Sequence, residues 1–297
     1  MNPVLKGYLQ LTRPANLPTS AADILAGIAI SGFFLINTEE QALGWMAVLL
    51  LVCSSIFLYA SGVVLNDVFD YRLDCVERPE RPIPSGVVPL TSASIFGGAL
   101  MVLGVLAAFC VGITSGAISL ALGVSILMYD ALGKHHSFFG PLNMGLCRGL
   151  NLLLGMSILG NLLHWQYAII PIVYIAAITL ISRGEVYGDN KRHIVLAALL
   201  YVMVIISLTV ILIYSGQNSL ISLPFALLFS ILIFRPLLKA FKENSPRNIK
   251  MAVKAGVISI IVLDAALAAG FSYWWVGVFT LLLLPLSILL SKLFAVT

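Results

Sequence analysis

The sequence predicts an all-α fold, a polytopic transmembrane bundle of nine to ten helices. Of its 297 residues, 60% are hydrophobic and 10% are charged, whereas soluble domains carry about 25% charged residues. The apolar residues form continuous runs close to the roughly 20 residues that a helix needs to cross a bilayer. Membrane barrels show alternating segments instead, so helices are the expected elements.

Ten apolar runs are the candidate spans. They cover residues 17–36, 43–65, 93–112, 117–132, 142–162, 167–182, 194–214, 220–238, 253–271 and 275–293. No polar linker or change of composition separates them, so residues 1–297 are expected to form a single transmembrane domain. The first thirteen residues lack the pattern of a cleaved signal peptide, so the first run is expected to be a retained span.

The basic residues predict the orientation of these spans. All seventeen Lys and Arg sort to one side of the ten-span topology, and Arg148, in the first turns of the fifth span, is assigned to that side as well. The loops on the other side carry only Glu39 and Glu40 as formal charges. Because Lys and Arg are enriched in cytoplasmic loops, both termini and the basic loops are expected to be cytoplasmic. The net charge of +4 is therefore explained by the membrane, and no nucleic-acid partner is expected.

Oxygen ligands cluster at the end of the second span. If the helix continues through the segment NDVFDYRLD, then Asn66, Asp70 and Asp74 recur at i, i+4 and i+8 and share one face, with Asp67 beside them. Carboxylates at this spacing repel one another unless a cation lies between them. Mg²⁺ prefers oxygen ligands and commonly bridges carboxylates to substrate phosphates. The segment therefore predicts an Mg²⁺ site, and a solvated loop of mixed charge is the alternative.

A second acidic cluster follows the sixth span. Glu185 and Asp189 again stand at i and i+4. Because the second and sixth spans run in the same direction, both clusters are expected at the same membrane face. Ionisable residues at the same depth in two spans favour a functional site over two unrelated solvated loops.

Four segments resemble motifs of the UbiA family of intramembrane prenyltransferases. Residues 66–74 match the NDxxDxxxD motif of that family, and the segment RPIPSG at residues 81–86 resembles its RPxxSG loop. The RPAN segment at residues 13–16 resembles the opening of its first helix, and RGLNLLLG at residues 148–155 resembles its RGxNxxxG helix. The resemblance implies a UbiA-like prenyltransferase fold, usually of nine spans.

The second cluster departs from the family pattern DxxDxxGDxxxG. Ser182 and Glu185 stand in place of the first two aspartates, and His193 stands in place of the final glycine. Glu185 and Asp189 retain oxygen ligands, so metal binding is still expected. The segment also resembles a divergent branch of the family, the UbiA-like EboC proteins, which suggests an unusual acceptor.

The resemblance implies Mg²⁺-dependent transfer of a prenyl group from a polyprenyl diphosphate to an acceptor within the membrane. It implies catalytic roles for Asp70, Asp74 and Asp189. The implied metal ligands are Asn66, Asp67, Asp70, Asp74, Glu185 and Asp189. The candidate diphosphate-binding residues are Asn16, Arg72, Arg78, Arg81, Lys134 and Lys191, of which the arginines offer the forked donors that suit phosphate oxygens.

Two other functions stay open at this point. A secondary transporter would place ion sites at the midplane within inverted repeats, and no such repeat is found here. A UbiA-like binding protein without activity is the second alternative, because Ser182 and Glu185 depart from the family pattern. The expected partners are a prenyl diphosphate, a small-molecule or lipid acceptor and membrane lipids. Asp23 and Asp130 are expected to pair with basic side chains, whereas no partner is predicted for Asp264.

Overall fold

The fold is all helical, as predicted. The computed structural model describes residues 2–36, 38–133, 136, 139–185, 188, 190–214 and 219–294, and these ranges contain no strand. The helices are α1 (Pro3–Leu11), α2 (Leu17–Ile30), α3 (Thr38–Phe69), α4 (Tyr71–Glu77), α5 (Leu90–Val111), α6 (Ile113–Met128), α7 (Phe139–Met156), α8 (Ile169–Ser182), α9 (Lys191–Tyr214), α10 (Ser219–Lys242), α11 (Pro246–Phe271), α12 (Trp274–Leu281) and α13 (Leu283–Leu293).

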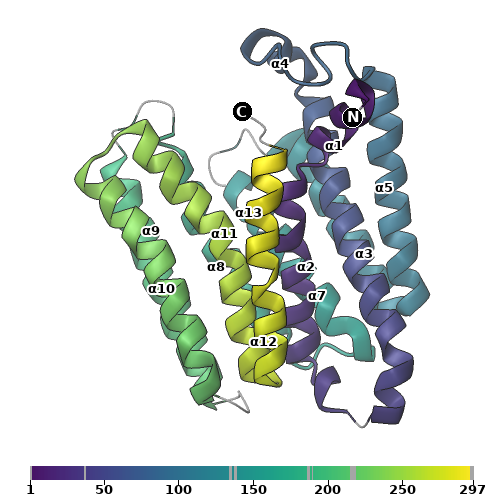
Figure 1. The fold of residues 1–297 in the computed structure, drawn as a ribbon, viewed down its shortest axis with the longest axis vertical. Coiled ribbons are helices and arrows are strands. Elements are labelled where there is room, and N and C mark those ends of the chain that lie inside the picture. Colours follow the sequence, from purple (N-terminus) through teal and green to yellow (C-terminus); the bar gives the residue numbers. More distant parts are fainter. Residues whose placement is uncertain are drawn as a thin grey trace.

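Within the described ranges, nine helical segments are long and apolar enough to cross a bilayer. They correspond to nine of the ten expected spans. The remaining span is α2, whose 14 residues measure about 21 Å at 1.5 Å per residue. Thirteen of those residues are buried, because α3, α7, α11 and α13 surround the helix (Figure 1). The expected first span is therefore a short central helix.

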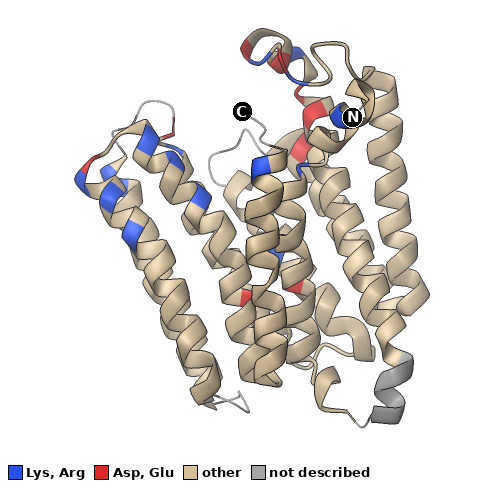
Figure 2. Ribbon diagram, in the orientation of Figure 1, with Lys and Arg blue, Asp and Glu red and all other residues tan. Residues whose placement is uncertain are grey.

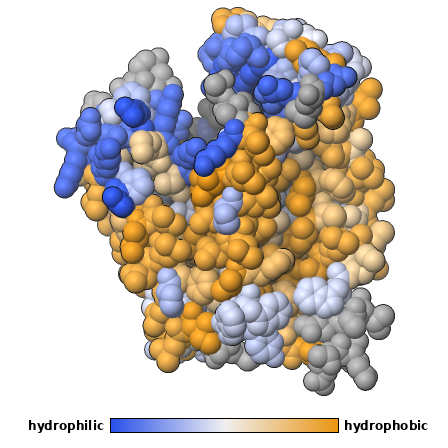
Figure 3. Space-filling model, viewed as in Figure 1, coloured by the Kyte–Doolittle hydropathy of each residue, from blue (hydrophilic) through white to orange (hydrophobic). Residues whose placement is uncertain are grey.

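The bundle has a charged end and an apolar middle. Figure 1 places both chain termini at the end that also carries α4. Lys and Arg gather at that end in Figure 2, and Figure 3 shows an apolar surface over the middle of the same face. This distribution agrees with the predicted sorting of charge, with one correction. Arg148 does not lie at the charged end: it is buried in the third turn of α7.

Two glycines let α2 and α7 touch along their backbones. A Cβ atom on Gly27 would meet the carbonyl oxygen of Leu152, and a Cβ atom on Gly155 would meet the carbonyl oxygen of Ile24. Side chains at both positions would force the two helices apart. In membranes, where association depends on close packing, small residues at such crossings are what permit the approach.

We expect Gly155→Ala to lower the free energy of unfolding by about 2 kcal/mol, because the added methyl group overpacks a contact between two backbones. Thermal unfolding of the purified protein in lipid nanodiscs measures this loss. Gly98→Ala is the matched control, because a Cβ at that position meets no atom within 4 Å. Equal stability of the two variants would show that the α2–α7 crossing is loose.

Candidate functional site

A cavity of about 320 Å³ lies at the centre of the bundle. Helices α2, α3, α6, α7, α8 and α11 contribute to its walls. The polar residues that line it are Arg13, Asn16, Ser20, Ser55, Tyr59, Asn66, Tyr129, Asp130, Arg148 and Asn151. Its apolar wall consists mainly of Val63, Leu122, Ile126, Met144, Ile175, Val257 and Ile260. We call the part near Asn66 and Arg13 the mouth, and the part formed by Ser20, Ser55, Tyr59, Arg148 and Asn151 the polar floor.

The segment with the first acidic cluster is bent. Helix α3 ends at Phe69, Asp70 has φ −84° and ψ 1°, and α4 begins at Tyr71. Backbone hydrogen bonds with helical spacing continue across the bend, from Asp70 N to Asn66 O at 2.9 Å and from Asp74 N to Asp70 O at 2.8 Å. The expected single helix is therefore two helices. Asn66 lines the cavity, and Asp74 is buried in the first turn of α4.

Arginine side chains form ion pairs with the carboxylates of Asp67 and Asp74. Arg81 Nη1 lies 2.6 Å from Asp74 Oδ2 and 3.2 Å from Asp67 Oδ1. Arg13 Nη2 donates to the same oxygen of Asp67 at 2.7 Å, and Arg78 Nη1 lies 4.0 Å from Asp74 Oδ1. Asp67 and Asp74 are both buried and the Arg81 side chain is 14% exposed, so the two pairs of Arg81 are largely protected from water and are stronger than surface ion pairs. Arg78 remains 52% exposed.

Arg13 lines the cavity, although it is not among the predicted diphosphate-binding residues. Its backbone is left-handed, with φ 46°, a conformation that costs a non-glycine residue about 1–3 kcal/mol and that clusters at functional sites. The turn that follows, Pro14–Asn16, is held from the other side by Ser287 of α13, which donates to Ala15 O at 2.6 Å. The RPAN resemblance was the signal that could have identified Arg13.

The side chains of Asn66 and Asp70, near the mouth, carry oxygen atoms that suit a small, hard cation. Asn66 Nδ2 donates to Asp70 Oδ2 at 3.3 Å, so an amide and a carboxylate lie side by side where α3 meets the cavity. Mg²⁺ is usually held by one or two carboxylates together with substrate phosphates and waters. This small oxygen set is therefore sufficient for such an ion when a diphosphate completes the coordination.

In the second cluster, Glu185 does not continue the helix of the sixth span, contrary to the i, i+4 expectation. Helix α8 ends at Ser182, and residues 183–185 form a turn in which Glu185 N donates to Ser182 O at 3.0 Å. Burial raises the pKa of the Glu185 carboxyl, and Lys250 of α11 lowers it by a smaller amount. A carboxyl in this setting gains from a cationic partner. Asp189 lies outside the described residues, and the described part holds no group of three or more acidic, His or Cys side chains suited to a metal.

The predicted diphosphate-binding residues separate into three groups. Asn16 lines the cavity, and Arg81 lies beside it on the two buried carboxylates. Arg72, Arg78 and Lys191 are exposed, and Lys191 Nζ lies 5.9 Å from the centre of the Phe241 ring. Lys134 lies outside the described residues. The structure therefore brings Asn16 and Arg81 toward the mouth and leaves Arg72 at the surface.

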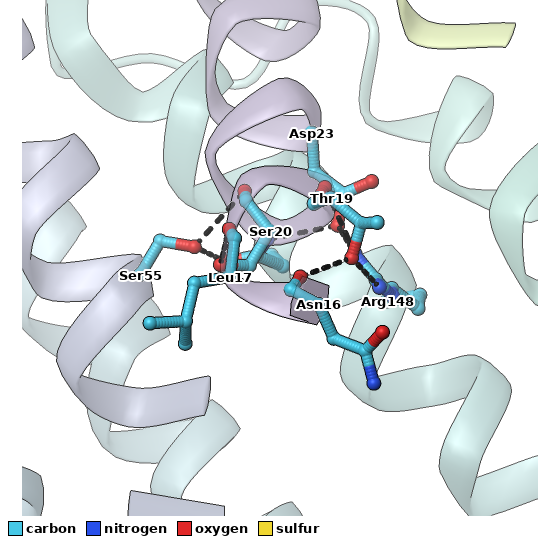
Figure 4. Close-up of polar contacts among 8 residues, drawn as sticks. Asn16, Leu17, Thr19, Ser20, Asp23, Ser55 and Arg148 are labelled. Carbon is cyan, nitrogen blue, oxygen red and sulfur yellow. Dashed lines mark hydrogen bonds and ion pairs between the residues drawn. The ribbon is translucent and has the colours of Figure 1, made fainter. Parts of the chain in front are cut away.

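The polar floor is a network that joins three helices (Figure 4). Arg148 Nη1 donates to Asp23 Oδ2 at 2.6 Å and to Thr19 O at 3.1 Å. Asn151 Nδ2 donates to the same oxygen of Asp23 at 2.8 Å, and Ser55 Oγ of α3 donates to Asn151 Oδ1 at 2.7 Å. The expected pairing of Asp23 with a basic side chain is thus confirmed.

Comparison with known proteins identifies relatives over most of the chain. A digeranylgeranylglyceryl phosphate synthase from Methanoregula boonei is 32% identical over 179 residues, which are 60% of this chain and 59% of that relative. The chain thus spans less than two thirds of that relative's length. A protein of the same name from Methanococcus maripaludis is 26% identical over 278 residues, which are 87% of this chain and 98% of that relative.

Solved structures share the fold. A digeranylgeranylglyceryl phosphate synthase structure superposes with a TM-score of 0.67 at 23% identity and covers 90% of this chain and 98% of its own. A UbiA homologue from Archaeoglobus fulgidus bound to GPP and Mg²⁺ superposes with a TM-score of 0.61 at 16% identity, over 86% and 99% of the two chains. Residues 25–258 match the model of the UbiA prenyltransferase family. The chain belongs to the UbiA prenyltransferase family.

Proposed function

We propose that this chain transfers a prenyl group from a prenyl diphosphate to an acceptor within the membrane, with Mg²⁺ as cofactor. The observation that carries the proposal is the cavity itself, which joins an oxygen-rich mouth at Asn66 to an apolar wall and a polar floor inside a transmembrane bundle. A prenyl diphosphate has a matching division, with an anionic head and an apolar chain.

The residues proposed to hold Mg²⁺ are Asn66, Asp70 and Asp74, with Glu185 and Asp189 from the second cluster. When bound, the ion would supply positive charge where the leaving diphosphate gains negative charge. Asp67 has a different proposed role, because Arg13 and Arg81 both contact its Oδ1 atom. It holds these two guanidinium groups at the mouth, where they stabilise the leaving group.

In the proposed reaction the C–O bond between the prenyl carbon and the diphosphate breaks, and its electron pair leaves with the diphosphate. An oxygen of the acceptor forms the new bond to that carbon, and its proton passes to the released diphosphate. The apolar wall excludes water, which would otherwise compete as the nucleophile. Residues such as Leu122, Ile126 and Ile260 provide this wall.

The names of the relatives suggest the acceptor. Proteins similar to this chain include digeranylgeranylglyceryl phosphate synthases, and a glyceryl phosphate lipid offers a hydroxyl group as nucleophile. We therefore infer an acceptor that reacts through a hydroxyl oxygen. The excess of Lys and Arg at one end of the bundle (Figure 2) supports a cytoplasmic mouth and cytoplasmic termini.

A transporter is less well supported. The charged residues at membrane depth, Asp23 and Arg148, neutralise each other in a direct ion pair, whereas a transport site must bind and release its ion. Turnover of a radiolabelled prenyl diphosphate by protein in detergent, where no gradient exists, distinguishes an enzyme from both a transporter and an inactive binding protein.

We expect Asp70→Ala, Asp74→Ala and Asp189→Ala each to lower prenyl transfer by about 100-fold or more, because each removes charge that positions the leaving group. Product formation from several prenyl diphosphates and lipid extracts, followed by mass spectrometry, measures the loss. Glu77→Ala is the control, since Glu77 is exposed on α4. Mg²⁺-dependent turnover retained in all three variants would refute the assignment.

We expect Arg81→Ala to lower the free energy of unfolding by about 3 kcal/mol, because it leaves two buried carboxylates without their shared partner. Added Mg²⁺ should restore part of this stability by taking the place of the guanidinium between Asp67 and Asp74. Thermal unfolding with and without Mg²⁺ measures both effects. Arg72→Ala is the matched control at an exposed arginine. A melting temperature that Mg²⁺ raises equally in both variants would argue against a cation site at these carboxylates.

A further inference from the structure

The charged end of α10 carries an open groove on its outer surface. The residues that line this groove are Ile231, Arg235, Leu238, Lys239, Lys242 and Glu243. None of these six is among the described residues that line the central cavity, and the proposed reaction assigns no role to them. Figure 2 shows Lys and Arg positions at this end of α10. We call this feature the α10 groove.

The spacing of the groove residues places them on one face of α10. Ile231, Arg235, Lys239 and Lys242 stand at i, i+4, i+8 and i+11, which is the spacing of a single helical face. The opposite face packs against α9 and α11. Its buried side chains, each at most 2% exposed, are Phe229, Ile233, Leu237 and Ala240. The groove therefore faces away from the bundle, toward the surrounding lipid.

The three basic side chains of the groove have no acidic partner in the described part of the chain. Elsewhere in the bundle, Arg13, Arg81 and Arg148 each form an ion pair with a buried aspartate. No ion pair of this kind involves a basic side chain of the groove. Three positive charges and the one negative charge of Glu243 give the groove a net charge of +2. An excess of Lys and Arg places this end of α10 in the cytoplasm but does not by itself gather three of them in one groove.

The same face of α10 is apolar toward the middle of the membrane. Leu227 is 63% exposed and Ile231 is 51% exposed. The eight residues from Leu227 to Arg235 measure about 12 Å at 1.5 Å per residue, within the roughly 15 Å that is half of the hydrocarbon core. Figure 3 shows the apolar surface meeting the hydrophilic end on the side where α10 lies. The face thus has an apolar part of the depth of one leaflet and a cationic part at its border.

We propose that the α10 groove binds one anionic phospholipid from the leaflet at the charged end. Its phosphate lies among Arg235, Lys239 and Lys242, and an acyl chain follows Leu227 and Ile231. Guanidinium donors suit phosphate oxygens, and basic residues beside a span attract anionic head groups. The long apolar stems of Lys and Arg lie along the helix while their charged ends reach the phosphate. Phosphatidylcholine fits less well, because its choline cation meets the same positive charges.

Native mass spectrometry of the full chain counts the lipids that stay bound. From micelles with equal amounts of phosphatidylglycerol and phosphatidylcholine, the wild type should retain phosphatidylglycerol in preference. We expect Arg235→Gln/Lys239→Gln/Lys242→Gln to weaken this preference about tenfold or more, because each basic residue near the membrane surface contributes about fivefold. A variant that keeps the full preference would overturn the proposal.

The matched control removes the same charge from scattered positions. Lys6→Gln/Arg247→Gln/Lys292→Gln changes three exposed residues on α1, α11 and α13, and we expect it to keep the preference for phosphatidylglycerol. An equal loss in both triple variants would show that only the total charge matters and would contradict a site on α10. Displacement of the lipid from the wild type by excess glycerol 3-phosphate or inorganic phosphate, at constant ionic strength, would also contradict it, because the groove would then be a site for free phosphate.

A photoreactive lipid locates the site without any variant. Phosphatidylglycerol with a diazirine in its acyl chain is incorporated into nanodiscs with the wild-type chain, irradiated and mapped by peptide mass spectrometry. We expect the label to concentrate on residues 227–238 of α10. The exposed faces of α5 and α9 are apolar as well and serve as internal references. A label spread evenly over the three helices would rule out a specific site.

The lipid site and the proposed prenyl transfer can fail separately. In lipid-free detergent we expect the triple variant of the α10 groove to turn over a prenyl diphosphate as the wild type does, which also shows that it is folded. A raised KM for the prenyl diphosphate would instead assign these side chains to substrate binding and contradict the lipid site. If the wild type transfers no prenyl group to any acceptor, the lipid measurements still decide the proposal, because none of them depends on the reaction.

Discussion

The ion pair between Asp23 and Arg148 is the constraint on which the centre of this bundle depends. Charges at membrane depth are tolerated only when they are paired or face a polar cavity, and this pair has a length of 2.6 Å. It joins α2 to α7 at a crossing that Gly27 and Gly155 permit. Through Asn151 and Ser55 it also fixes α3, the helix that carries Asn66. A central helix as short as α2 is stabilised because two neighbouring helices, α3 and α7, satisfy its polar groups.

The mouth of the cavity has a different arrangement of charges from the floor. At the floor one cation balances one anion, whereas at the mouth Arg13, Arg78 and Arg81 surround Asp67 and Asp74. The backbone of Arg13 is left-handed, and the guanidinium of Arg81 bridges two buried carboxylates. The guanidinium groups of Arg13 and Arg81 are therefore held in place before any ligand arrives. Preorganised charge of this kind stabilises a leaving group without a cost of reorganisation during the reaction.

The cavity therefore has a gradient of polarity that matches the substrates proposed for it. A charged mouth suits a diphosphate, an apolar wall suits a prenyl chain, and the polar floor is built around the ion pair of Asp23 and Arg148. Membership of the UbiA family agrees with the first two of these features.

Sequence alone determined the helical class, the spans and the end of the bundle that carries the basic loops, because hydropathy and charge placement are local properties that the bilayer imposes directly. It also predicted Asn66, Asp70 and Asp74 as metal ligands, and this remains a proposal. Only the tertiary structure decided the bend at Asp70 and the burial of Arg148. The burial of Arg148 depends on Asp23, a partner 125 residues away along the chain, and no periodicity within one segment records which distant helix will supply the opposite charge.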